Sequence, residues 1–188
     1  METAIIAPFL FTTVIGLTDL GLYLFRWNQA VEATRIGARL AAVSDPVSSE
    51  LAGMTGLETG VEAGEPVGAY LRVCGGGQAC EGGTYSATAF SRIFHGPGST
   101  ACGDATGRER VGMCDAFRVL TPANVTIRYQ ESGADTAGSV GALRPLISVK
   151  VSAAPSGVVI LDRLAPGAFR LLPAAETTVV AEDLSSSG

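Results

Sequence analysis

The chain has 188 residues, of which 47% are apolar and only 16% are charged, and its formal net charge is −5. The apolar composition excludes a wholly disordered chain, and the presence of a single long apolar stretch excludes a polytopic membrane protein. An acidic balance without any cluster of basic residues argues against nucleic-acid binding.

The N-terminal region is apolar over the length of a membrane span. Residues 3–25 contain one charged side chain, Asp19, and residues 3–18 contain none. A membrane-spanning helix needs about 20 mostly apolar residues, and an acid costs about 2.5–3.5 kcal/mol at the bilayer centre but less toward the edge. The sequence favours a spanning helix, with a buried core helix as the alternative.

The helical pattern continues past this stretch and becomes amphipathic. No proline occurs between Arg26 and Val43, whereas Pro46 disfavours a helical residue before it. One helix of about 40 residues, about 60 Å long, is therefore predicted within residues 1–45. Small residues at helical spacing permit close approach of another helix, so partner helices are expected on that stripe. The stripe consists of Ala30, Ala33, Gly37 and Ala41, beside a polar stripe of Asn28, Glu32, Arg35 and Arg39.

The remainder of the chain predicts a small head of the α+β class. Glycines, prolines and acids in residues 46–68 indicate a linker or an irregular surface segment, with a short helix near 48–54. The head is expected over 69–184, and 185–188 read as a tail. Period-2 alternation predicts three strands of an antiparallel sheet, with helices on one face. The strands are expected at 124–129, 147–151 and 177–181, and short helices at 85–94 and 108–119.

One apolar segment of the head lacks a clear period. Residues 156–173 are rich in valine and leucine but match neither the helical nor the strand repeat. Two readings remain open, namely an excursion that packs into the core and an exposed loop that binds a partner.

The four cysteines give the best indication of compartment. Cys74 and Cys80 are close in sequence, as are Cys102 and Cys114, and each pair encloses a glycine-rich segment. Local pairing within each group is the simplest of three possible disulfide patterns, and it implies an oxidising compartment. The alternatives are four buried free thiols or a zinc site, for which these spacings are unsuited.

Nothing in the sequence favours an enzyme or a bound cofactor. His95 is the only histidine, and its place before Gly96 predicts a residue that caps a helix end rather than a catalytic base. No phosphate-binding motif is present. Glu58, Glu62 and Glu65 could bind calcium weakly, but they read more simply as a solvated acidic segment.

The first 43 residues resemble a known family. An acid, Glu2, opens the apolar run and Pro8 follows; Asp19 then precedes Leu20 and Gly21, and an Ala- and Arg-rich stretch comes after Asn28. This order is similar to that of the TadE-like family, which comprises minor pilins or pseudopilins of the tight adherence (Tad/Flp) type IV pilus. Asp19 stands where the family commonly has Glu.

The resemblance implies a bacterial inner-membrane protein whose head lies in the periplasm and which then enters a pilus that supports adhesion. The implied partners are major and minor pilins, a prepilin peptidase, the inner-membrane assembly platform and the lipid bilayer. The peptidase would remove a short basic leader just before the position of Glu2, so we expect the given chain to be a mature or trimmed form. The arginines after the apolar run would by themselves favour the opposite topology, but the cysteines and the resemblance outweigh them.

The two N-terminal acids have expected roles in assembly. The resemblance implies that Glu2 neutralises the amino terminus of a neighbouring subunit, although a charge at a helix N-terminus also gains about 0.3–1 kcal/mol from the macrodipole. An acid inside a membrane span is a functional-site hypothesis by default. We expect Asp19 to meet a cation or donor on another pilin or on the assembly platform.

A second class of function stays open at this point. A single-pass anchored periplasmic or surface protein whose head binds a ligand, without any filament role, would have the same composition. The amino terminus of the native mature protein would distinguish the two readings. The head is also poor in charge, since 25 of the 144 residues from residue 45 onward are charged, which favours an assembly component.

Overall fold

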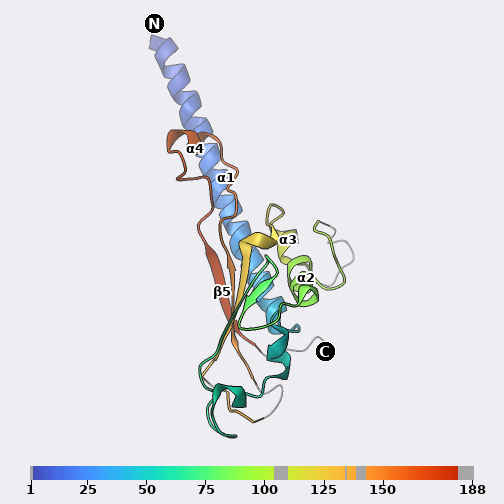
Figure 1. Ribbon diagram of the computed structural model, residues 1–188. Helices are drawn as coiled ribbons and strands as arrows, with labels where there is room; N and C mark the ends of the chain where they lie inside the picture. The colour runs from blue at the N-terminus through green and yellow to red at the C-terminus, as the bar shows by residue number, and fades with distance from the viewer. Residues whose placement is uncertain (1, 104–109, 134, 139–142, 182–188) are drawn as a thin grey trace.

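The computed structural model describes residues 2–103, 110–133, 135–138 and 143–181, and it places one long helix against a small α+β head (Figure 1). The helices are α1 (Glu2–Ala42), α2 (Ala87–His95), α3 (Met113–Ala116) and α4 (Ile160–Leu164), with 3-10 turns η1 (Ser49–Gly53), η2 (Leu57–Thr59) and η3 (Pro122–Asn124). The strands are β1 (Leu71–Gly75), β2 (Ala79–Glu81), β3 (Val125–Gln130), β4 (Leu146–Val151) and β5 (Ala175–Val180). The predicted fold class and the long N-terminal helix are confirmed.

The five strands form one antiparallel sheet in the order β2-β1-β3-β4-β5. Its register brings one row of inward-facing residues across every strand: Cys80, Cys74, Ile127, Val149 and Thr177. Alternate residues of each strand face opposite sides, so this row fixes which side of the sheet becomes the core.

The C-terminal half of α1, which is the lower half in Figure 1, packs on that side, next to β4 and β5. Thr34 is fully buried, and its hydroxyl shares a 2.8 Å hydrogen bond with the Thr177 hydroxyl of β5. The opposite side of the sheet carries exposed charged residues, namely Arg128, Lys150 and Glu176. The prediction of a sheet with helix on one face is therefore confirmed.

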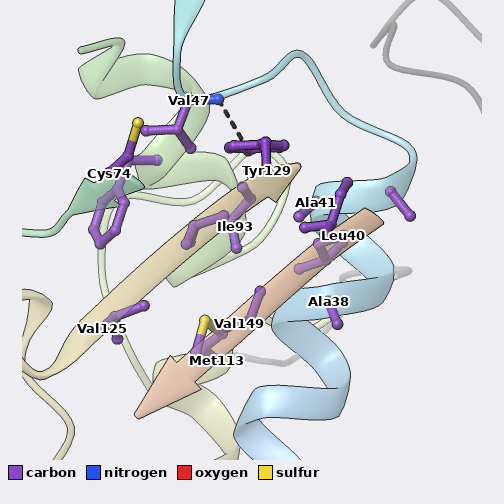
Figure 2. Packing of buried hydrophobic residues seen from close by; sticks show 14 of the residues in the cluster. Ala38, Leu40, Ala41, Val47, Cys74, Ile93, Met113, Val125, Tyr129 and Val149 are labelled. Carbon is purple, nitrogen blue, oxygen red and sulfur yellow. Dashed lines mark hydrogen bonds between the residues drawn. The ribbon is translucent and has the colours of Figure 1, made fainter. Parts of the chain in front are cut away.

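The core lies between α1, the sheet, α2 and α3 (Figure 2). Ile93 of α2 and Met113 of α3 are fully buried, as is Tyr129 of β3. The Val47 amide donates a 3.1 Å hydrogen bond to the Tyr129 hydroxyl, and this bond ties the chain just after α1 to the centre of the sheet.

The sequence analysis did not predict two of the strands, β1 and β2. β1 and β2 are short, and Gly76 and Gly77 lie between them, so neither shows a sustained alternation. The helix predicted over 108–119 is only the four residues Met113–Ala116 within the described part of the chain. The residue before α3, Gly112, lies in contact with the backbone of His95 at the end of α2, where any side chain would collide.

Residues 46–68, for which a linker or an irregular surface segment was expected, pack against the head. They contain η1 and η2, and Val47, Leu51 and Met54 are buried in the common core cluster. Three apolar side chains spaced by irregular turns give no periodic signal, which is why the composition alone suggested a linker. The expected tail, 185–188, lies outside the described residues.

Candidate functional site

The N-terminal half of α1, which is the upper half in Figure 1, extends beyond the head as an apolar helix. We refer to it as the bare half of α1. The segment Ile6–Ala42 is long and apolar enough to cross a membrane, and none of its most apolar window is buried in the protein. Phe9 is 75% exposed and Leu17 is 65% exposed. A helix that left such surface in water would be strongly unfavourable, so this half of α1 requires lipid or protein partners.

Three threonine side chains within the bare half have hydrogen-bond partners in the helix itself. The hydroxyls of Thr12, Thr13 and Thr18 donate to the carbonyl oxygens four residues earlier, at 2.7, 2.8 and 2.9 Å. Hydrogen bonds of this kind allow threonine to lie in hydrocarbon without an unpaired donor. The apolar segment is therefore compatible with a bilayer up to Asp19.

Asp19 has donors within its own chain. Its Oδ2 atom accepts hydrogen bonds from the backbone amides of Ile160 at 2.7 Å and Leu161 at 3.1 Å. The carboxylate therefore caps the first turn of α4. The sequence analysis expected a cation or donor on another pilin or on the assembly platform, and that expectation stays a prediction. In the described structure two donors come from the same chain, 141 and 142 positions further on.

Two further contacts hold the segment around α4, residues 156–172, against α1. The Arg26 guanidinium donates to the Ser156 carbonyl at 2.6 Å, and the Tyr23 and Phe169 rings meet edge to face with centroids 5.7 Å apart. Gly157 lies in the left-handed region at φ 66° and against the Arg26 guanidinium, so a side chain there would strain the backbone and displace the guanidinium. We refer to residues 156–172 as the clasp loop, because it holds α1 at the level of residues 19–26.

The clasp loop has both buried and exposed apolar side chains. Near its two ends Val158 and Leu172 are buried, which agrees with an excursion that packs into the protein. Between and beside them Val159, Leu164 and Leu171 are 60%, 68% and 48% exposed. The loop thus has a packed base and an apolar outer surface.

The small-residue stripe of α1 does permit close packing, but its partner is the head of the same chain. Ala30, Ala33 and Ala41 are at most 1% exposed, and a Cβ atom at Gly37 would lie 2.5 Å from the Met113 sulfur. The expectation of another helix on this stripe is therefore corrected for the described structure. The four residues of the polar stripe lie on the exposed side, where Arg35 and Glu32 form a surface ion pair at 3.5 Å.

Both local disulfides are present. Cys74 is bonded to Cys80, joining β1 to β2, and Cys102 is bonded to Cys114 of α3. His95 lies close to the second bridge, and its Nδ1 shares a 3.1 Å hydrogen bond with the Ser91 hydroxyl. Sulfurs engaged in a disulfide are not thiolate ligands, so this group does not form the zinc site that was weighed as an alternative.

Two of the acids that were expected to be solvated, Glu58 and Glu65, accept hydrogen bonds from backbone amides in local turns. Both carboxylate oxygens of Glu58 accept from the Thr55 amide, and Glu65 accepts from the Glu62 amide. Hydrogen bonds from the Glu58 amide and from Thr55 lower the pKa of the Glu58 carboxyl below its ordinary value, although burial acts in the opposite direction.

The long helix is also the part of the chain that matches a known family. Residues 1–39 match the family described as TadE-like protein. This confirms the resemblance seen in the sequence. The TadE-like segment ends within α1 and includes Glu2 and Asp19 but no part of the sheet. No match was found among curated proteins or among solved structures.

Sequence reasoning identified Asp19 but missed the clasp loop that binds it. The TadE-like segment contains the acid, whereas its donors are main-chain amides, which have no residue-specific signature. Two features of the sequence could have indicated this contact: Asp19 is a charge without a counterion in an apolar helix, and residues 156–173 are an apolar segment without a clear period. Each of them requires a partner.

Proposed function

We propose that this protein is a minor pilin or pseudopilin that assembles into, initiates or caps a Tad/Flp-type pilus and so supports adhesion. The observation that carries the proposal is the match of residues 1–39 to the TadE-like family, which coincides with a helix whose first half is bare and apolar. A Tad pilus-associated protein needs such a segment both in the membrane and, afterwards, in contact with other subunits.

The proposed location is the bacterial inner membrane with the head in the periplasm, and later the pilus outside the cell. Support comes from the two disulfides, because such bonds persist in the periplasm and are rare in the cytosol. The apolar length of α1 supports single-pass anchoring.

The proposed partners are other major and minor pilins, the prepilin peptidase and the assembly platform. In this proposal Glu2 neutralises the amino terminus of a neighbouring subunit during assembly. The burial of the small-residue stripe in the head leaves the bare half of α1 and its exposed polar stripe for contact with those partners.

The test is deletion of the gene and complementation in the bacterium that carries it. We expect deletion to reduce the pili counted by electron microscopy, and the wild-type chain to restore them. Glu2→Ala should fail to restore pili, whereas Glu176→Ala, at an exposed acid of β5 in the head, should restore them. Normal piliation and adhesion in the deletion strain would contradict the proposal and favour an anchored periplasmic or surface binding module.

A further inference from the structure

We propose that the clasp loop is a second membrane contact: its exposed apolar side chains enter the edge of the bilayer that holds α1. The occupant is therefore the lipid of that same bilayer. The inference rests on membrane anchoring by α1 and does not depend on a role in pili.

The length of the uncharged helix sets the level of the membrane surface. Residues 3–18 span about 24 Å, whereas the hydrocarbon core of a bilayer is about 30 Å thick. About four more helical residues are needed to span the hydrocarbon core, which brings its edge to the level of Leu22 and Tyr23. That is the level at which Asp19, Tyr23 and Arg26 hold the clasp loop.

The loop presents apolar surface at this level. Val159 and Leu164 are the most exposed of its large apolar side chains. On α1 itself, Leu20 is 40% exposed and Leu24 is 48% exposed at the same height. The apolar surface of the helix thus continues onto the loop, which lies beside α1 on the side of the head nearer the N-terminus (Figure 1).

The charges of the loop suit a lipid headgroup layer. Arg163 and Arg170 are exposed, and long arginine side chains can reach phosphate groups while apolar neighbours lie deeper. Asp162 accepts a hydrogen bond from the Gly167 amide at 3.1 Å, so this acid is engaged within the loop. Anionic lipid would therefore meet two cations.

This arrangement also explains why an acid is tolerated at position 19. A carboxylate near the hydrocarbon edge loses water, and two amide donors replace part of that hydration. Conversely, a loop that enters the bilayer edge must satisfy its own main-chain groups, and Asp19 accepts from two of them. Each partner thus lowers the desolvation cost of the other.

Depth-dependent quenching of tryptophan fluorescence tests the inference on the full chain. The single tryptophan, Trp27, is replaced by Phe, and Leu164→Trp is introduced as the probe. The protein is reconstituted into vesicles of phosphatidylglycerol and phosphatidylcholine with brominated acyl chains. Leu17→Trp on the bare half of α1 is the positive control, and Leu57→Trp, an exposed leucine (43%) at the opposite end of the head, is the matched control.

We expect the Leu164→Trp emission to shift to shorter wavelength and to lose about half of its intensity to brominated lipid, as an interfacial side chain should. The Leu57→Trp emission should stay unchanged. Val159→Trp gives an independent second probe of the loop, so a local perturbation at one position does not decide the result.

The inference is overturned if both loop probes remain unquenched while Leu17→Trp is quenched; anchoring by α1 then stands alone. If Leu17→Trp is also unquenched, anchoring and the loop contact both fail. If the loop probes shift only as protein concentration rises and do not respond to brominated lipid, a second copy of the chain covers the loop and lipid does not.

Discussion

The carboxylate of Asp19 accepts a 2.7 Å hydrogen bond from the Ile160 amide, joining the apolar helix to a loop that follows 141 residues later. Asp19→Leu removes the acceptor, whereas Asp19→Asn retains one amide oxygen. Hydrogen bonds to a charged group contribute about 1.5–3 kcal/mol, so the Ile160 and Leu161 amides should exchange with solvent about tenfold faster or more in Asp19→Leu. The effect of Asp19→Asn should be smaller.

Hydrogen–deuterium exchange of the detergent-solubilised full chain measures this effect. Thr18→Val is the matched control, because the Thr18 hydroxyl donates only to the Val14 carbonyl of its own helix among the contacts described. Equal protection of the clasp loop in Asp19→Leu and Thr18→Val would show that the capping contact does not hold the loop.

Two buried tyrosine hydroxyls of the head should respond oppositely to removal. Tyr129→Phe leaves the Val47 amide without its buried acceptor and should lower the free energy of unfolding by about 1–3 kcal/mol. The Tyr70 hydroxyl is buried without a hydrogen-bond partner in the described part of the chain, so Tyr70→Phe should be neutral or stabilising. Urea unfolding monitored by circular dichroism measures both, and equal losses would contradict this prediction.

The same tyrosines make stability sensitive to alkaline pH. Burial raises the pKa of Tyr129 above its ordinary value, and burial, aided by Asp135 and Glu131, raises that of Tyr70. The unfolded chain then releases phenolic protons first, so the stabilisation is complete below the ordinary pKa of about 10 and is lost as pH rises through the higher folded pKa. Urea unfolding between about pH 8 and 11 should show this decline, and Tyr129→Phe should make it shallower. A decline of unchanged steepness in that variant would exclude Tyr129 as a source.

The close contact between Gly37 and Met113 should not tolerate a side chain. Gly37→Val places methyl groups where a Cβ already lies 2.5 Å from sulfur, and overpacking of this kind costs about 1–3 kcal/mol. Gly53→Val is the control, because nothing lies within 4 Å of a Cβ at that position. Thermal unfolding should separate the two variants, and similar midpoints would place α1 further from α3 than described.

The disulfides predict a simple labelling result. The protein isolated without reductant and then denatured should give no thiol labelling at Cys74, Cys80, Cys102 and Cys114, and all four should label after reduction. Removing either pair by substitution with Ala should cost about 2–3 kcal/mol, given the short loops that they close. Four labelled thiols in the unreduced protein would contradict both bridges.

The sequence predicted those features that carry a local repeat or a local pairing. The long helix, β3, β4 and α2 have uninterrupted periods, and neighbouring cysteines pair over short loops. The TadE-like resemblance was likewise contained in a continuous N-terminal segment, and the family match covers the same segment.

The missed features depend on contacts between distant parts of the chain. A stripe such as Ala30 and Gly37 fits a second helix or a sheet equally well, and only the tertiary fold decides between them. The donors to Asp19 are main-chain amides that any residue could provide. Composition can indicate that such partners are needed, but it does not locate them.

Because the last turns of α1 form part of the core, the helix cannot turn or tilt without the head. Ala38 and Ala41 are fully buried there, and the clasp loop adds a second support further along the helix. A head tilt of about 6° would therefore move the far end of a helix of about 60 Å by about 6 Å. A force applied to the head therefore reorients the apolar end of the helix.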